Sequence, residues 1–243
     1  MATVRVGSEP SVAYRDADLL VLVKPAGLAT TSPDGRDCLV AVAHELDPRA
    51  PRLHATSRLD AEVTGLVTFA RTERATTRLL EARRRGDYHR RYLALASHGP
   101  EPVEGRWTWP ISLDRSDKRK RMAGHGPSER HAETEYRTAS LASGVAALHL
   151  FPHTGRTHQL RVHASKAGCP LLGDVHYGGP RRVTRSDGRV VTAARVMLHC
   201  AELDLPSSDP KARLRLVCDA PDDLRAVWAA LGGEASALEP PAR

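Results

Sequence analysis

The sequence predicts an α+β protein with a mixed, mostly antiparallel central sheet and flanking helices. Short apolar runs with strand-like spacing outnumber the helical segments and are scattered among them. The chain has 243 residues, of which 41% are hydrophobic, so it is long enough to bury a core. No stretch approaches the roughly 18 apolar residues that a membrane helix requires, so we expect no membrane segment.

The first half of the chain alternates strands and helices. The apolar run at 18–23 ends at Pro25 and Gly27, as a buried strand followed by a turn does. Helical spacing over 73–84 ends at Gly86, a residue typical of helix C-termini. The other elements that we expect here are a short helix over 39–46, a strand near 65–70 and a strand over 88–96.

The second half is richer in strands. A helix near 157–167 ends at Gly168, and a last helix begins at Pro221, followed by two aspartates that suit the positive end of a helix dipole. We expect one domain over residues 1–232 and a disordered tail over 233–243. The expected strands lie near 103–109, 133–141, 145–151, 196–205 and 213–218, with a polar loop or mobile hairpin tip over 115–130.

The basic residues are nearly all arginine. The formal net charge is +7, and only five of the 36 basic residues are lysine. Arginine binds phosphate through paired hydrogen bonds and stacks on bases, which favours RNA as a partner. Codon usage in a GC-rich genome explains much of the same bias, so composition alone does not decide the partner.

Cysteine usage and the N-terminus favour a reducing compartment. Cys38, Cys169, Cys200 and Cys218 form no CxxC pair, which argues against a zinc or redox centre and for small apolar core residues. The N-terminus lacks the apolar core of a signal peptide. We therefore expect a cytoplasmic protein.

Two dense blocks of polar residues point to chemistry. In the first, Asp60 follows Arg58 and precedes the dipeptide Thr64-Gly65, where we expect a sharp turn before the apolar run at 66–70. The second, at 153–163, is rich in arginine, histidine and hydroxyl groups. An isolated Asp before Thr-Gly is usually a turn or capping residue. The arginine next to it and the distant arginine-rich block favour a catalytic carboxylate instead.

Arg161 and Tyr92 are the candidate partners of Asp60. Arg161 is either a solvent-exposed helix residue or a charge partner that holds the Asp60 carboxylate ionised, as a nucleophile or base requires. Tyr92 is either a half-buried strand residue or a platform on which a pyrimidine stacks, with a phenol able to move a proton.

Metal, hydrolase and nucleotide-cofactor chemistry lack support. His153, His158 and His163 recur every five residues, but five helical residues rotate a side chain by about 140°. On a strand the same odd step changes the face of the sheet. No GxSxG, P-loop or GxGxxG pattern is present, so we expect neither a metal nor a cofactor.

A basic tract lies within the polar segment at 115–130. Such a charge run is usually a solvated loop, and beside a cleft it would clamp phosphates. Because the rest of the sequence points to RNA, we expect the clamp. Its residues are Lys118, Arg119, Lys120 and Arg121.

These blocks resemble the RluA family of pseudouridine synthases over residues 10–230. Residues 57–65 are similar to the family's His-Arg-Leu-Asp-x-x-Thr-Ser-Gly motif, and 91–94 to its Lys-x-Tyr-x-Ala strand. The third block is 154–163 followed by Pro170-Leu171-Leu172-Gly173-Asp174 and Tyr177-Gly178. Ser57 and Val63-Thr64 depart from the motif, and the S4 domain of many relatives is not expected before the first strand.

The resemblance implies a pseudouridine synthase catalytic domain over 1–232 with a central cleft, acting on rRNA or tRNA. It implies that Asp60, Arg161 and Tyr92 are the catalytic residues and that Arg58 helps to flip the target nucleotide. It implies RNA contacts also at Arg156, Thr157 and His158. Because the implied reaction exchanges one bond for another without net oxidation or group transfer, we expect no metal or cofactor, and we predict no obligatory protein partner. The alternative is a non-catalytic RNA-binding protein on the same scaffold.

Overall fold

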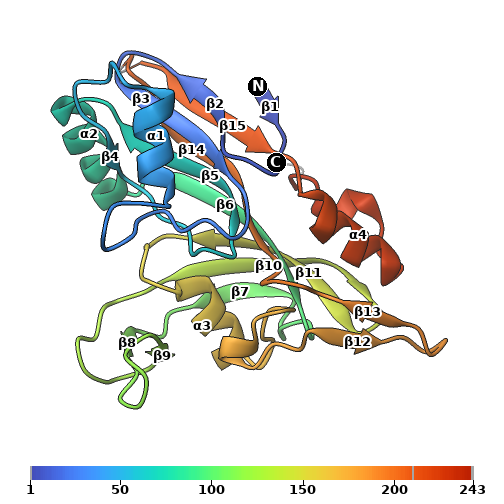
Figure 1. Cartoon of the computed structure of the whole chain (residues 1–243). Helices are drawn as coiled ribbons and strands as arrows, with labels where there is room; N and C mark the ends of the chain where they lie inside the picture. Colours follow the sequence, from blue (N-terminus) through green and yellow to red (C-terminus); the bar gives the residue numbers. More distant parts are fainter. Residues whose placement is uncertain (1, 210, 242–243) are drawn as a thin grey trace. The chain divides into compact units, whose positions relative to one another are not determined.

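A computed structural model describes residues 2–209 and 211–241, and these fall into two compact units. Unit 1 runs to Arg90 and includes His199–Pro221, whereas unit 2 holds Arg91–Leu198 and the described residues from Asp222 onward. The chain passes between the units within two strands and again after Pro221. Figure 1 shows the helices and strands of each unit.

Unit 1 is a sheet with two helices. The strands follow the order β2-β3-β5-β14, and β15 pairs with both β14 and β1. The β5–β14 and β1–β15 pairs are parallel, whereas the β2–β3 and β3–β5 pairs are antiparallel. The elements are β1 (Ala2–Val4), β2 (Ser11–Arg15), β3 (Leu19–Lys24), α1 (Leu39–Leu46), β4 (His54–Ala55), β5 (Thr64–Ala70), α2 (Glu73–Arg85), β14 (Leu198–Pro206) and β15 (Arg213–Cys218).

The core of unit 1 is centred on β3 and β5. Every residue of both strands is buried, because the apolar runs occupy both faces of the sheet. Helix α2 begins with the Thr72 hydroxyl accepting a hydrogen bond from the Ala75 amide and ends at Gly86 in the left-handed conformation. Both predicted helices of this unit are confirmed, and α1 has the predicted bounds.

Gly65 corrects one local prediction. Thr64 and Gly65 do not form a turn, because they are the first residues of β5 and pair with His199 and Cys200 of β14. Gly65 has φ 114°, and a Cβ there would lie 2.2 Å from the carbonyl oxygen of Cys200. The glycine is required because the backbones of β5 and β14 approach closely.

Unit 2 is a four-stranded antiparallel sheet with two hairpins and two helices. The sheet order is β6-β11-β10-β7. Because most of the chain's strand pairs are antiparallel, the predicted fold class is confirmed. The elements are β6 (His89–Ala96), β7 (Glu104–Trp107), β8 (Ile111–Leu113), β9 (Arg121–Ala123), β10 (Thr134–Ala142), β11 (Val145–Pro152), α3 (Gln159–Lys166), η1 (Val175–Tyr177), β12 (Arg182–Thr184), β13 (Val190–Thr192), α4 (Asp222–Ala230) and η2 (Ala235–Leu238).

The segments between the long strands of unit 2 hold more structure than expected. The polar segment at 115–130 contains the turn of hairpin β8–β9. Hairpin β12–β13 was not expected from the sequence. Within the expected tail, Ala235–Leu238 form a 3-10 turn, and Ala237 and Leu238 are buried.

Candidate active site

The Asp60 loop is held by buried polar groups of unit 1. The Thr30 hydroxyl donates to the Leu59 carbonyl at 2.8 Å and accepts from the Leu59 amide at 2.9 Å. On the other side of Asp60, the Lys24 ammonium donates to the Ala61 carbonyl at 2.9 Å. The Asp60 side chain itself is half-buried, as a group that must meet a substrate requires.

Lys24 holds the Asp60 loop in place, a role that the sequence reasoning missed. Its side chain is fully buried, and it also donates to the carbonyls of Pro25 and Leu28 at 2.8 and 2.6 Å. A buried ammonium is costly unless its donors are satisfied, so these carbonyls hold it in place. The lysine thereby ties the loop after β3 to the Asp60 loop. Its sequence signal is a lysine at the end of an apolar strand, in a segment similar to the Lys-Pro-x-Gly turn of the RluA family.

The strand that follows Asp60 is fixed by a histidine. His199 is fully buried, and its Nε2 lies 3.1 Å from the Cys218 carbonyl, to which it must donate. Its Nδ1 therefore accepts from the Thr64 hydroxyl at 2.9 Å. Together with the close approach at Gly65, this hydrogen bond sets where β5 begins and hence where the Asp60 loop ends.

Arg161 is buried in α3 and forms a two-pronged ion pair. Its Nε and Nη2 atoms donate to the two oxygens of Asp174 at 2.7 and 2.8 Å. The side chains of Arg161 and Asp174 are only 9% and 1% exposed. Arg161 is therefore not the solvent-exposed helix arginine of the alternative interpretation. Sequence reasoning saw Asp174 only as part of a motif and did not predict the pair.

Tyr177 lies against this ion pair and contacts His158. The Arg161 guanidinium lies 5.0 Å from the centre of the Tyr177 ring, within the range of a cation–π contact. The Tyr177 hydroxyl is 2.6 Å from Nδ1 of His158, which precedes α3 in the left-handed conformation. The hydroxyl also accepts from the Arg121 amide at 2.9 Å. Tyr177 thus joins α3 to hairpin β8–β9.

The N-terminus of α3 is organised by Gln159. Its amide group donates to the Glu133 carbonyl and the Thr134 hydroxyl, both at 3.0 Å. Its oxygen accepts from the Thr154 hydroxyl at 2.7 Å and from the Arg156 amide at 3.0 Å. The loop at 154–159 is therefore held by the Gln159 side-chain amide, which forms hydrogen bonds with both backbone and hydroxyl groups.

Tyr92 lies in β6, opposite Leu150 of β11, and is 5% exposed. It belongs to unit 2 together with Arg161, whereas Asp60 belongs to unit 1. The pairing of Asp60 with Arg161 and the central cleft stay predictions.

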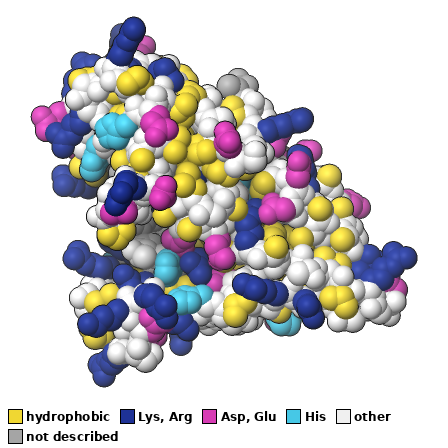
Figure 2. Space-filling view, viewed as in Figure 1, with side chains coloured by type: hydrophobic (Ala, Val, Ile, Leu, Met, Phe, Trp, Pro, Cys, Tyr) yellow, Lys and Arg dark blue, Asp and Glu magenta, His cyan; other side chains and the backbone are white. Residues whose placement is uncertain are grey.

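The basic tract forms the turn of hairpin β8–β9. Lys118 and Arg119 are exposed, but Arg119 forms an ion pair with Asp117 at 3.1 Å. Hydrogen bonds from the Arg119 side chain and amide lower the pKa of Asp117 to about 2. Arg121 donates to the carbonyls of Lys118 and Lys120 at 3.0 and 2.7 Å, so it braces the turn. Figure 2 shows lysine and arginine side chains gathered over this hairpin.

The other predicted RNA contacts are exposed. Arg58 lies in the Asp60 loop of unit 1, and Arg156 and Thr157 precede α3 in unit 2. The Arg156 Nε donates to the His131 carbonyl at 2.8 Å, which leaves the rest of the guanidinium available. In the described part of the chain, no three His, Cys, Asp or Glu side chains are placed to hold a metal ion, and no helix is long and apolar enough to cross a membrane.

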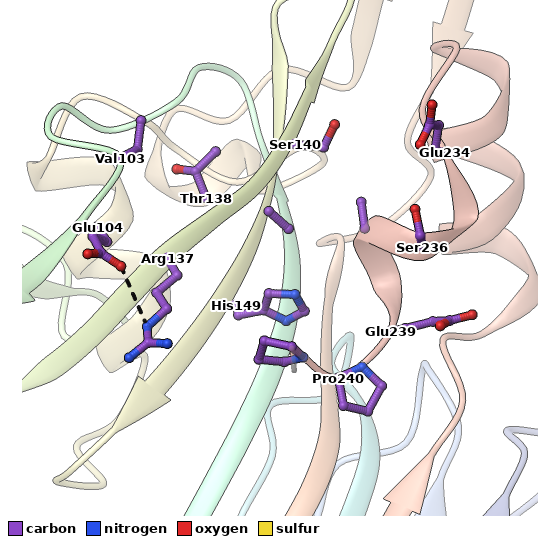
Figure 3. Close-up of a pocket in the computed structure, with 13 residues that line it drawn as sticks. Val103, Glu104, Arg137, Thr138, Ser140, His149, Glu234, Ser236, Glu239 and Pro240 are labelled. Atoms are coloured by element: carbon purple, nitrogen blue, oxygen red, sulfur yellow. Dashed lines mark ion pairs between the residues drawn. The ribbon is translucent and has the colours of Figure 1, made fainter. Parts of the chain in front are cut away.

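A pocket of about 430 Å³ lies in unit 2, away from all of these residues. It is bounded by strand β10, by His149 of β11 and by residues 234–241 (Figure 3). None of the predicted site residues lines it, so it is not the candidate active site.

The family model for RNA pseudouridylate synthase matches residues 18–166, which include Asp60, Tyr92 and Arg161. The chain belongs to this family. Its activity is therefore the isomerisation of uridine to pseudouridine in RNA, as the resemblance implied.

Curated relatives and solved structures agree with this assignment. The chain is 34% identical to the mitochondrial pseudouridylate synthase RPUSD4 of Xenopus tropicalis, with 88% of this chain and 78% of the relative covered. It is 41% identical to ribosomal large subunit pseudouridine synthase D of Yersinia pestis, with 70% of this chain and 53% of the relative covered. The structure of the human RNA pseudouridylate synthase domain-containing protein 4 superposes with a TM-score of 0.70, at 27% identity over 91% of this chain and 93% of that one.

Proposed function

We propose that the chain converts a uridine of large-subunit ribosomal RNA to pseudouridine, with Asp60 as the catalytic carboxylate. The RNA class is suggested by relatives named ribosomal large subunit pseudouridine synthase D in Yersinia pestis and Vibrio cholerae. Transfer RNA is the other class to test.

The observation that carries the role of Asp60 is its anchored, half-buried loop. Thr30 holds the residue before Asp60, and Lys24 holds the residue after it. Because the loop is fixed on both sides of Asp60, it holds the carboxylate in position and does not have to move during the reaction. A turn residue with no catalytic role needs no such anchoring by a fully buried lysine.

In the proposed reaction, the target uridine leaves the RNA stack and enters the site, where Tyr92 packs on the base. Asp60 acts on the ribose, either by attacking C1′ or by removing the C2′ proton. The N1–C1′ bond breaks, uracil turns while bound, and C5 bonds to C1′. The C5 proton leaves and N1 gains a proton, so the product is an isomer of the substrate.

Arg161 is proposed to stabilise the charge on Asp60. Its Nε and Nη2 are both taken by Asp174, which fixes the plane of the guanidinium. A guanidinium that is oriented in advance stabilises a nearby carboxylate without reorganisation. The rest of that group is the part proposed to face Asp60.

The experiment is tritium release from C5-labelled uridine in separate transcripts of large-subunit rRNA and of tRNA. Release from the rRNA transcript alone supports the proposed substrate class, and release from tRNA alone overturns it. The modified position follows from carbodiimide labelling and primer extension. Binding to both RNAs without release from either would favour the non-catalytic alternative.

A further inference from the structure

We propose that hairpin β12–β13 is an RNA-binding arm that contacts the phosphate backbone of a duplex next to the target nucleotide. The arm comprises residues 181–193. It deepens the proposed function, because it assigns a second RNA contact to the same enzyme. None of its residues was among the RNA contacts expected from the sequence.

The arm is a closed two-stranded hairpin. Its base is closed by the Ala193 amide, which donates to the Arg181 carbonyl at 2.8 Å. At its tip, the Arg185 amide donates to the Arg189 carbonyl at 2.9 Å. Side chains alternate along both strands, so Val183 and Val191 are half-buried on one face. The exposed face carries Arg182, Thr184, Val190 and Thr192.

The arm is strongly basic. It carries Arg181, Arg182, Arg185 and Arg189 against a single acidic residue, Asp187. Arg185 and Arg189 lie 3.4 and 3.9 Å from Asp187, so one carboxylate is shared by two arginines. Arg181 and Arg182 are exposed and form no ion pair within the described residues. Figure 2 shows basic side chains clustered at the end of this hairpin.

Helix α4 supports the arm at both ends. Near the base, Arg195 donates through Nε and Nη2 to the two oxygens of Asp223 at 2.7 and 2.8 Å. Near the tip, Arg185 donates to the Ala230 carbonyl at 2.5 Å. A hairpin fixed at two points loses little conformational freedom when it binds a partner. The helix holds the arm through Arg185 and leaves the side chains of Arg181 and Arg182 exposed.

The base of the arm is joined to the turn that carries Asp174. The Gly173 amide donates to the Pro180 carbonyl, and the Gly179 amide donates to the Asp174 carbonyl, both at 2.8 Å. A Cβ on Gly179 would lie 1.8 Å from the Leu171 carbonyl oxygen, so this turn is tightly closed. The arm therefore starts at the same rigid turn that orients Arg161.

The side chains of the arm fit phosphates better than bases. Its exposed side chains include the guanidinium groups of Arg181 and Arg182 and the hydroxyls of Thr184 and Thr192, and residues 181–193 include no aromatic residue on which an unpaired base would stack. Arginines on a rigid ribbon match the regularly spaced phosphates of a duplex. Hairpin β8–β9, on which the other basic tract lies, is a separate element of the same unit.

The test compares a double variant of the arm with a charge-matched control. R181E/R182E removes the two arginines of the arm that form no ion pair with any described residue. R49E/R84E removes two exposed arginines of unit 1 for which the same holds. Both variants lower the net charge by the same amount. The probe is a fluorescein-labelled RNA duplex of unrelated sequence, and its anisotropy is measured from low to moderate salt. If the charge reversal disturbs folding, R181Q/R182Q replaces R181E/R182E as the arm variant.

We expect the arm variant to bind the duplex about tenfold more weakly and to reduce the salt slope by about one to two, while the control stays close to wild type. Equal weakening in the arm variant and the control would overturn the proposal. The proposal would also be overturned if the arm variant lost affinity for single-stranded RNA but kept its affinity for the duplex. Because the duplex assay does not depend on catalysis, failure of the proposed function appears separately, as absence of tritium release by the wild-type protein.

Discussion

Both terminal oxygens of Asp174 accept hydrogen bonds from the guanidinium of Arg161, thirteen residues earlier in the chain. The pair is almost completely buried, so neither charge is screened by water. The ring of Tyr177 covers the guanidinium 5.0 Å away. This arrangement fixes the orientation of Arg161, and we infer that Asp174 is a positioning residue for the arginine that is proposed to act on Asp60.

Replacing Asp174 with asparagine should lower both activity and stability. The amide keeps the shape but removes the charge, so the buried Arg161 loses its ionic contact with residue 174. We expect kcat to fall on the order of 10- to 100-fold and the free energy of unfolding to fall by about 3 kcal/mol. Tritium-release kinetics and urea unfolding measure the two effects. D47N breaks a similar two-pronged pair, between Arg71 and Asp47 in unit 1, and should leave kcat unchanged; equal losses of kcat would contradict the positioning role.

Replacing Tyr177 with phenylalanine separates its two contacts. The ring over Arg161 remains, whereas the hydroxyl that bonds His158 and the Arg121 amide is lost. We expect KM for RNA to rise several-fold because hairpin β8–β9 loses an anchor, while kcat stays near wild type. Steady-state kinetics with varied RNA concentration measure the split. A loss confined to kcat would show instead that the hydroxyl serves the chemistry.

Gly65 is required by backbone contact rather than by flexibility. In G65A, the new methyl group meets the Cys200 carbonyl, and φ 114° is itself unfavourable for alanine. We expect a loss of about 4 kcal/mol or more, measured by urea unfolding. The matched control is G86A, where φ is 78° but no atom lies within 4 Å of the added Cβ. That change should cost only about 1 kcal/mol, and equal losses would contradict the close approach.

His163 should make stability fall at acidic pH. Burial lowers its pKa, since the imidazole is fully buried between the Trp109 carbonyl and the Thr134 hydroxyl. The stability that neutral His163 contributes is fully present above its pKa in the unfolded chain, about 6.5. This stability is lost as the pH falls toward the lower pKa that His163 has in the folded protein. Below pH 6.5, the unfolded chain binds a proton that the folded chain does not, which costs up to about 1.4 kcal/mol per pH unit. Urea unfolding at several pH values should show a shallower decline in H163Q; parallel curves would contradict this account.

Local patterns predicted the elements whose signals are contiguous in the sequence. The run at 18–23 became β3, and α1 and α2 ended near the predicted residues because apolar spacing and the Gly86 cap act locally. The four cysteines are buried and free, as their spacing indicated. Hairpin β12–β13 was missed because only Val183 and Val191 face inward, too few for a period-2 pattern.

Partners that are distant in the sequence could not be predicted. The pairing of Arg161 with Asp174 requires the turn at Gly173, and the role of Lys24 requires the Asp60 loop to lie over the end of β3. The Thr64-Gly65 dipeptide was taken for a turn because its backbone neighbour, Cys200, lies far along the chain. These contacts depend on tertiary structure, so no single window of the sequence contains them.

The most direct test of the central claim is tritium release and RNA affinity measured on one preparation each of wild type, D60N, D60A and the neighbouring control E62Q. We predict release by wild type and E62Q, and a loss on the order of a thousandfold or more in both Asp60 variants, with RNA affinity and unfolding free energy retained. Substantial release by D60A, or a parallel loss of folding and binding in both Asp60 variants, would contradict a catalytic role for Asp60.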